Sequence, residues 1–228
     1  MKIAISCFVL LAISSMAATS SAQIVDFVET FDNGSADFSD FGDNPATFVP
    51  ASPDSSAFIS TFNDFADGFI FLTTTRVENQ NGFLPSGGAF FGDFIADEVT
   101  SVLFDIRHDF DQSLDFNIRI APSDNFPGAF LLDPITIEPG SEFQEFNIDV
   151  QPGNFSFEVA PGPGVFESIF SDVQNFQLFA LLPGGVSSGT FQVDIDNFEI
   201  NTADVPEPSS SMVLTLAMMG LSISRRRS

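Results

Sequence analysis

The sequence contains one cysteine, no tryptophan and no tyrosine among its 228 residues. The single thiol, Cys7, lies in the first apolar segment, so a chain that loses this segment has no cysteine. This excludes disulfide bonds, cysteine-bound zinc and a thiol nucleophile in the rest of the protein. Sites that hold sugar rings usually stack them on Trp or Tyr, and the absence of both weighs against a sugar-active enzyme and against a sugar-binding module.

Basic residues are also scarce, because 7 Lys and Arg stand against 31 Asp and Glu and give a formal net charge of −24. Four of the seven lie at the ends of the chain, as Lys2 and the run Arg225 to Arg227. The long interior keeps only Arg76, Arg107 and Arg119. A surface this acidic repels nucleic acid, which we exclude as a partner, and attracts divalent cations, so we expect bound Ca²⁺.

Histidine occurs once, at position 108. A Ser-His-Asp triad would have to use His108, and no nucleophile-elbow glycine pattern accompanies it. Its place between Arg107 and Asp109, at the end of a predicted strand, favours a solvated side chain. A glycosidase needs only two carboxylates about 5 to 9.5 Å apart, and so many acidic residues supply such a pair by chance. We therefore expect a protein that is not an enzyme.

Phenylalanine is abundant, with 30 residues in a chain that is 44% hydrophobic. This apolar area is enough to offset chain entropy, so the acidic interior is expected to fold as one domain at residues 23–203. Most Phe side chains are expected in the core. Seven lie in segments without clean alternation and are alternatively candidates for a cleft or partner surface: Phe38, Phe41, Phe62, Phe65, Phe90, Phe91 and Phe94.

The N-terminal segment, residues 1–22, has the three parts of a secretion signal. Lys2 gives a positive start, Ile3 to Ile13 an apolar stretch, and Ser14 to Ala22 a run of small residues. A signal peptidase is expected to cut before Gln23, with a cut after Ala18 as the alternative. The sequence thus predicts an exported protein.

The C-terminal segment, residues 204–228, combines a Pro-Glu-Pro motif, a short apolar run and an arginine cluster. In order, these are Pro206, Glu207 and Pro208, then Met212 to Ile223, then Arg225, Arg226 and Arg227. This arrangement resembles the PEP-CTERM sorting signal of bacteria that make extracellular polysaccharide matrices. The resemblance implies processing by an exosortase, a membrane transpeptidase, with the Pro-Glu-Pro motif and the arginines as recognition elements.

Elementary geometry supports a transient membrane segment at this end. The twelve residues from Met212 to Ile223 span roughly 18 Å as a helix, short of a hydrocarbon core of about 30 Å. By the positive-inside rule the arginines stay cytoplasmic, which places the acidic domain on the exported side of the inner membrane. The alternative is a Pro-rich linker before a plain tail anchor. We expect the mature protein at the cell surface or in the extracellular matrix.

Short apolar runs with a period of two fill the interior, and no amphipathic helix is evident there. The alternation is strict in Leu114 to Ile120 and recurs in Phe146 to Val150. Glycine and proline punctuate the runs, which is typical of an all-β sandwich. Further strands are predicted at 68–75, 99–107, 154–159, 176–182 and 190–200, with one helical turn at 168–174. A bulge is expected near Asp196 and Asn197, where the alternation changes phase.

The two ends of this domain carry acidic residues in short strand-like patterns, at 29–34 and 193–200. These patterns resemble the first and last strands of jelly-roll domains of the carbohydrate-binding-module type. There the terminal strands lie side by side and often share a structural calcium. The resemblance implies Ca²⁺ ligands at Glu29, Asp32 and Asp196, with Asp194 and Asn197 in reserve. The alternative is that these side chains are solvated acids at strand ends.

Three functions fit the sequence. The first is a non-enzymatic structural or adhesive component of the cell surface or extracellular matrix. The second is a calcium-stabilised, lectin-like module that binds extracellular polysaccharide. The third is a hydrolase or lyase that acts on such a polysaccharide.

Overall fold

The computed structural model describes residues 23–40, 42–53, 55–65, 71–79, 82–184 and 189–203. The predicted signal segment, residues 1–22, and the predicted sorting segment, residues 204–228, lie outside these ranges. The same holds for the two flanking helices expected there. No helix in the described ranges is long and apolar enough to cross a membrane.

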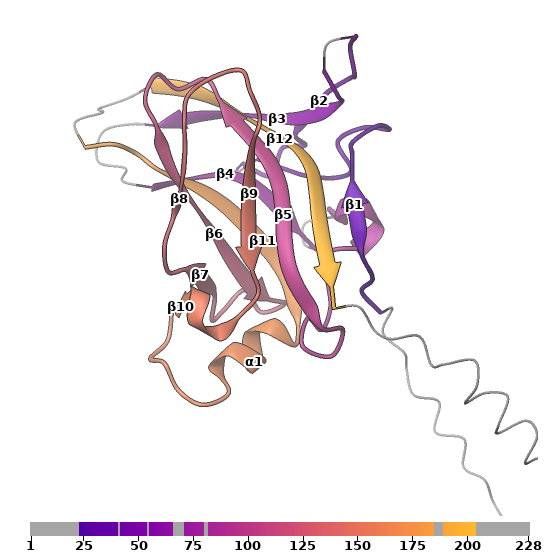
Figure 1. Cartoon of the computed structure of the whole chain (residues 1–228), viewed down its shortest axis with the longest axis vertical. Coiled ribbons are helices and arrows are strands. Elements are labelled where there is room, and N and C mark those ends of the chain that lie inside the picture. The colour runs from indigo at the N-terminus through magenta and orange to yellow at the C-terminus, as the bar shows by residue number, and fades with distance from the viewer. Residues whose placement is uncertain are drawn as a thin grey trace, which may run out of the picture.

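Strands dominate the described chain, as Figure 1 shows. In the first half these are β1 (Phe27–Glu29), β2 (Thr47–Val49), β3 (Phe58–Phe65), β4 (Phe71–Glu78), β5 (Val99–His108) and β6 (Leu114–Pro122). In the second half they are β7 (Ala129–Leu131), β8 (Ile135–Ile137), β9 (Gln144–Asp149), β10 (Phe155–Phe157), β11 (Val173–Leu181) and β12 (Gly189–Thr202). The helical elements are two 3-10 turns, Pro85–Gly88 and Pro152–Asn154, and α1 (Val165–Phe170).

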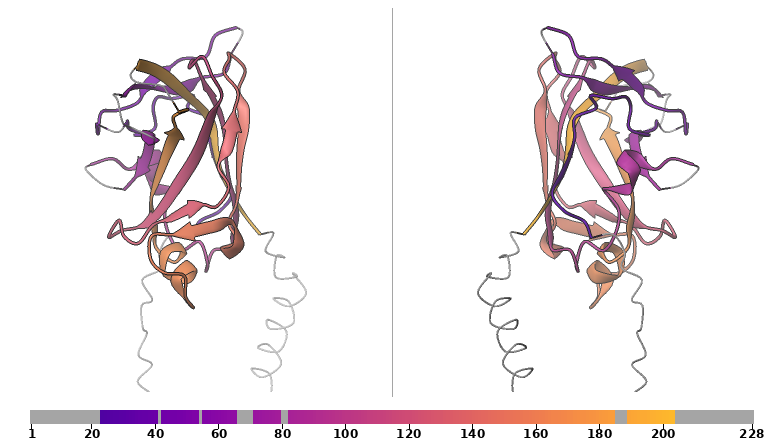
Figure 2. Two further views of the ribbon diagram at one scale, coloured as in Figure 1. Left: turned by 90° about the vertical axis from the view of Figure 1, so that its left-hand side faces the viewer. Right: turned by 90° about the vertical axis from the view of Figure 1, so that its right-hand side faces the viewer.

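Within the described residues the strands form two antiparallel sheets, which Figure 2 shows from two sides. Sheet A has the order β2-β3-β12-β5-β9, and β1 also pairs with β12. Sheet B has the order β10-β7-β6-β11-β4, and β8 also pairs with β6. The prediction of an all-β, jelly-roll-like sandwich is confirmed. The terminal strands also lie side by side as predicted, since Phe27 of β1 is opposite Ile200 of β12.

The core lies between the two sheets and is rich in stacked Phe rings. Phe198 is 2% exposed, and its ring stacks on Phe104 at 5.4 Å and meets Phe90 edge-on at 4.7 Å. It faces inward because a bulge lies between Asp196 and Glu199 and reverses the alternation of β12. The predicted bulge is therefore confirmed, and after it Phe198 and Ile200 point into the core.

The seven Phe residues in irregular segments divide between core and surface. Phe38, Phe90 and Phe94 are fully buried, Phe65 and Phe91 are nearly so, and Phe41 lies outside the described residues. Of the six that the structure describes, only Phe62, on the outer side of β3, is exposed, at 67%. Irregular loops thus contribute core side chains that the period-two pattern could not identify.

Two local predictions need correction. His108 ends β5 and is 2% exposed, with Nε2 3.0 Å from the Ile137 carbonyl oxygen, so the predicted solvated side chain is wrong. The alternation of β5 turns His108 inward with Phe104 and Ile106. The predicted helical turn at 168–174 is displaced, because α1 covers Val165–Phe170 and β11 begins at Val173.

Candidate functional site

A groove crosses the outer face of sheet B. Phe176, Leu178 and Ala180 of β11 are buried in the core, so Gln177 and Phe179 point to the opposite face. The groove has a volume of about 500 Å³ and draws on all five strands from β4 to β10. Its lining residues are Thr73, Asn117, Arg119, Phe130, Leu131, Ser156, Glu158, Gln177, Phe179 and Leu181.

An aromatic pair lies within this groove. The rings of Phe130 and Phe179 meet edge-on, with centroids 5.6 Å apart and planes at 73°. Phe179 is opposite Asn117 of β6 and Thr73 of β4, so each neighbouring strand presents a polar side chain beside its ring. The arrangement offers an apolar ring surface next to amide and hydroxyl groups.

Arg119 is the cation of the groove, and its guanidinium group is held on several sides. Nε and Nη2 donate to the two carboxylate oxygens of Glu158 at 2.8 and 3.0 Å. Nη1 donates to Asn125 Oδ1 at 2.7 Å, and Nη2 also donates to the Asn125 carbonyl oxygen. Most N–H groups of Arg119 are therefore engaged within the protein, which fixes the side chain and neutralises its charge.

Glu158 is correspondingly fixed as a carboxylate. The hydrogen bond from Arg119 lowers the pKa of Glu158 below its usual value; burial opposes this shift, and the Gly128 amide, which donates at 2.6 Å, adds to it. Gly128 also makes room for the pair, because a Cβ atom there would lie 2.5 Å from Arg119 Nε. The ion pair thus depends on a glycine in the neighbouring loop.

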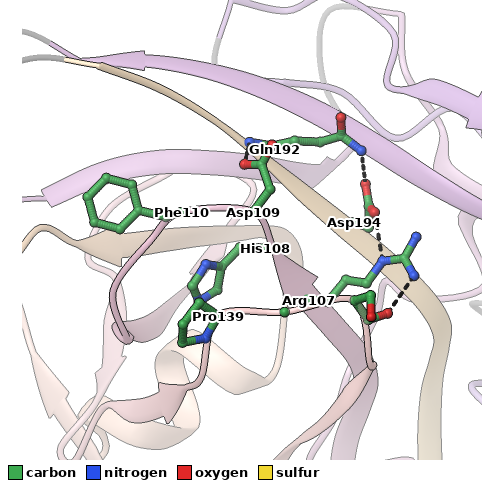
Figure 3. Close-up of a pocket in the computed structure, with 9 residues that line it drawn as sticks. Arg107, His108, Asp109, Phe110, Pro139, Gln192 and Asp194 are labelled. Carbon is green, nitrogen blue, oxygen red and sulfur yellow. Dashed lines mark hydrogen bonds and ion pairs between the residues drawn. The ribbon is translucent and has the colours of Figure 1, made fainter.

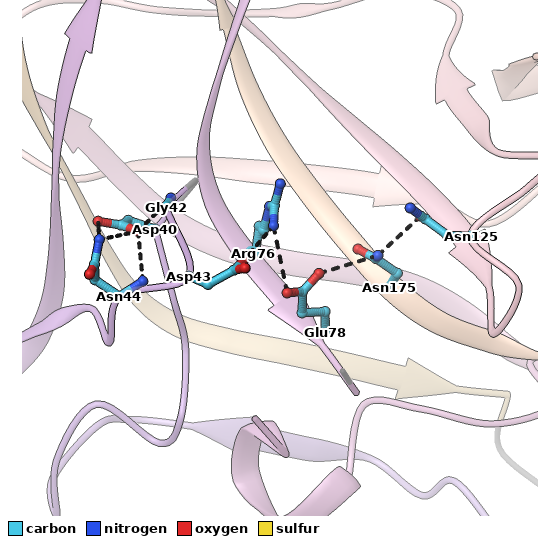
Figure 4. Close-up of polar contacts among 8 residues, drawn as sticks. All are labelled: Asp40, Gly42, Asp43, Asn44, Arg76, Glu78, Asn125 and Asn175. Carbon is cyan, nitrogen blue, oxygen red and sulfur yellow. Dashed lines mark hydrogen bonds and ion pairs between the residues drawn. The ribbon is translucent and has the colours of Figure 1, made fainter. Parts of the chain in front are cut away.

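A second arginine borders the groove. Arg76 is opposite Gln177 on the adjoining strand, and Gln177 is in turn opposite Arg119. Figure 4 shows Arg76 directed to Asp43, whose Oδ1 lies 2.7 Å from Nη1, and to Glu78 at 3.7 Å. Two of the three interior arginines therefore line one face, and each has an acidic partner.

The polar contacts continue from Glu78 toward Arg119. Asn175 Nδ2 lies 3.4 Å from Glu78 Oε2 and 3.2 Å from Asn125 Oδ1, as Figure 4 shows. Because Asn125 also accepts from Arg119, one chain of contacts joins both arginines. Such a network restricts side-chain motion along this part of the face.

The predicted calcium ligands are only partly brought together. Asp196 is 2% exposed, and this burial raises its pKa. Hydrogen bonds from Ser56 Oγ and the Asn197 amide lower the pKa in part. The negative charges of Asp105 and Asp32 raise it further. The charge of Asp32 therefore acts on Asp196. Sequence reasoning missed Asp105, which accepts from Asn197 Nδ2 at 2.8 Å.

Glu29 is committed elsewhere. Its two carboxylate oxygens accept from the Phe31 amide at 2.8 Å and from Ser86 Oγ at 2.7 Å. Within the described ranges no three His, Cys, Asp or Glu side chains are grouped closely enough to hold a metal ion. Calcium also accepts backbone carbonyl ligands, so a site at Asp32 and Asp196 stays a prediction.

Asp194 lies in a different setting, on the outer face of sheet A. Figure 3 shows its carboxylate between Arg107, whose Nε donates at 2.8 Å, and Gln192, whose Nε2 donates at 2.7 Å. The Arg107 guanidinium group also lies over the rings of Phe58 and Phe143, at 4.6 and 4.4 Å. Asp194 thus serves an ion pair and is not joined to Asp196 in one cluster.

Sequence reasoning did not identify the groove residues as a site. The strict alternation of Leu114 to Ile120 did assign Asn117 and Arg119 to a solvent-facing side. It could not show that Phe130 of the adjoining strand β7, and Glu158, which follows the edge strand β10, would lie beside them. That proximity depends on strand order, which period-two patterns do not encode.

Comparison with solved structures finds matches of low sequence identity. An agarase matches with a TM-score of 0.48 and 12% identity over 81% of this chain, and the chain spans 25% of the agarase. A family 11 carbohydrate-binding module from Clostridium thermocellum, solved with a mixed-linked tetrasaccharide, has a TM-score of 0.47 and 16% identity, covering 80% of this chain and 98% of the module. A family 28 module specific for non-crystalline cellulose has a TM-score of 0.46 and 12% identity. The match covers 75% of this chain and 91% of the module. Identities this low concern the fold alone.

Comparison with curated proteins gives no match. A family model does match the end of the chain, at residues 204–227, and its description is the PEP-CTERM protein-sorting motif. The matched range contains the predicted recognition residues, which lie outside the described part of the structure: Pro206, Glu207, Pro208, Arg225, Arg226 and Arg227. The chain therefore carries a PEP-CTERM sorting signal, which indicates an exported protein that an exosortase processes.

Proposed function

We propose that the domain is a non-catalytic module that binds a neutral polysaccharide along the outer face of sheet B, at the cell surface or in the extracellular matrix. The observation that carries the proposal is the groove in which the Phe130 and Phe179 rings lie among amide and hydroxyl side chains. Binding there gives a sorted surface protein its adhesive role. The groove is open and crosses five strands, a width of about 19 Å, which suits a chain of several linked sugar rings.

Each feature of the lining corresponds to a feature of a sugar chain. The apolar faces of pyranose rings stack on aromatic side chains, and Phe supplies that surface in a protein without Trp or Tyr. Sugar hydroxyl groups require hydrogen-bonding partners, which Gln177 and Thr73 provide at the groove surface, while the Asn117 amide is engaged by the Leu131 backbone. A few well-placed polar groups on a largely apolar surface are typical of small-molecule and oligomer sites.

Charge favours an uncharged ligand. Among the described residues that line the groove, Arg119 and Glu158 are the only ionised side chains, and they neutralise each other. Arg76, at the border, is balanced by Asp43. Because the whole sequence is strongly acidic, a polysaccharide that carries carboxylate or sulfate groups would be repelled, and the arginine it would meet in the groove is already engaged by Glu158.

The same geometry argues against hydrolysis in this groove. Glycosidases require a pair of carboxyl groups, one of which is protonated when the bond breaks. Glu158 is the one carboxylate among the described lining residues, and Arg119 lowers its pKa and so keeps it ionised. An acid with a lowered pKa is a poor proton donor at neutral pH.

Affinity measurements on the purified domain test the proposal. We expect binding to neutral polysaccharides such as β-glucan, xylan or agarose, and none to alginate or polygalacturonate. Phe179→Ala should weaken binding about tenfold or more, through loss of one stacking surface. Phe143→Ala is the matched control, because this Phe lies beside Arg107 on the outer side of the opposite sheet. Equal losses for the two variants, or preferential binding of the anionic polymers, would contradict the proposal.

A further inference from the structure

The last described residues before the sorting signal, Thr202 and Ala203, are hydrogen-bonded to the rest of the domain. The Thr202 amide and hydroxyl group both donate to Asp26 Oδ1, at 2.7 and 2.8 Å. The Ala203 amide donates to the Glu98 carbonyl oxygen at 2.8 Å. The two hydrogen bonds from Thr202 lower the pKa of Asp26 below its usual value, as expected for a carboxylate that accepts them.

The sorting motif begins at the next residue, 204. Since each residue extends the chain by at most about 3.6 Å, Glu207 cannot lie more than about 14 Å from Ala203. Only Asp204 and Val205 separate the last described residue from the Pro-Glu-Pro motif. An enzyme that binds this motif must therefore bind it close to the end of the sandwich.

Enzymes that cut a peptide chain bind it in an extended form, through backbone groups on both sides of the bond. On the domain side, the nearest backbone groups in the described structure belong to Asn201, Thr202 and Ala203. Asn201 and Thr202 pair with Ser101 and Val99 of β5, and the Thr202 and Ala203 amides are engaged as described. In the folded state these backbone groups are not free to enter an enzyme cleft.

Local opening of the C-terminal stub, residues 201–203, is expected to stop at Ile200. Ile200 is fully buried and lies opposite both Phe27 of β1 and Val102 of β5. A register shift between Asn201 and Thr202 already weakens the pairing beyond it. Local opening of the stub can therefore occur while the core stays intact, as is common at strand ends.

We propose that the hydrogen bonds between Asp26 and Thr202 hold the C-terminal stub, residues 201–203, against the sheet. Opening of this stub then limits the rate at which the exosortase processes the chain. The stability of the folded stub then sets the rate of processing, since a chain whose stub opens more often is processed faster than one with the native contacts. This role is independent of the glycan groove, which lies on the other sheet.

The test compares processing rates in cells that contain the exosortase, by pulse labelling of the full chain and following its conversion to the shorter form. Asp26→Asn should accelerate conversion roughly three- to tenfold, the change in open population expected when a hydrogen-bonding acceptor is weakened. A flexible Gly-Ser insertion of about eight residues after Ala203 adds roughly 26 Å of reach and should accelerate it as well. Asp26→Asn should then add nothing to the insertion.

Asp111→Asn is the matched control, because it removes one exposed acid that follows the His108 end of β5, whereas the stub pairs with the Val99 end. Hydrogen exchange of the Thr202 and Ala203 amides provides a second readout and should accelerate in Asp26→Asn with the melting temperature unchanged. Faster exchange without faster processing would overturn the proposal. So would slower processing of the insertion variant, which would show that the enzyme requires the sandwich close to the motif.

Discussion

The Arg119–Glu158 pair can be tested by a substitution that touches neither residue. In Gly128→Ala the added Cβ atom would lie 2.5 Å from Arg119 Nε, 2.8 Å from Cζ and 2.9 Å from Nη2. All three distances are well below van der Waals contact, so the guanidinium group has to move by about 1 Å. Arg119 is only 8% exposed and is held by Glu158 and Asn125, so it cannot move without losing hydrogen bonds.

The size of the effect follows from those bonds. A hydrogen bond to a charged group contributes about 1.5 to 3 kcal/mol, and the partial exposure of Glu158 places the loss near the lower end. Replacing Gly by Ala returns up to about 1 kcal/mol by restricting the unfolded chain. The net destabilisation is thus about 0.5 to 2 kcal/mol, or a melting temperature about 1 to 8 °C lower for a domain of this size.

Thermal denaturation at pH 7 measures this directly, with Gly153→Ala as the control. A Cβ atom added at Gly153 would meet no heavy atom within 4 Å, and this glycine lies in an exposed 3-10 turn. The same chemical change there should therefore leave the midpoint unchanged or slightly higher. The reasoning would be refuted if Gly128→Ala melted within about 1 °C of Gly153→Ala. Glycan affinity should fall in Gly128→Ala alone.

Three further predictions concern pH, metal and packing. The pKa of Glu158 is lowered in the folded state, so this carboxylate contributes fully to stability above its ordinary pKa of 4.5. The contribution is lost as the pH falls through the folded-state pKa. Melting temperatures measured in acid should not show this loss in Glu158→Gln. If calcium binds at Asp196, EDTA should lower the melting temperature of the wild type and not of Asp196→Asn, and an unchanged wild-type midpoint would exclude the metal. Phe198→Ala should cost about 3 to 5 kcal/mol in urea unfolding, because it leaves a cavity among stacked rings; a loss below about 1 kcal/mol would contradict the core assignment.

Strands with clean alternation were predicted from sequence close to their true bounds, as for β5, β6 and β12. Others were missed for physical reasons. The run Phe58–Phe65 alternates poorly because Phe62 is exposed while Ser60, Thr61 and Asn63 are buried, so β3 has no readable pattern. The strands β7 and β8 have three residues each, too few for periodicity to emerge.

The sequence by itself determined the C-terminal sorting signal, the acidic character and the all-β class, because each depends on composition or on local order along the chain; the N-terminal secretion signal stays a prediction. Tertiary structure alone decided where the acids and arginines meet. Asp194 and Asp196 are two residues apart, yet one pairs with Arg107 and the other lies near Asp32 and Asp105. Strand order brings Phe130 and Glu158 beside Arg119, and a groove made by five strands cannot be read from any one of them.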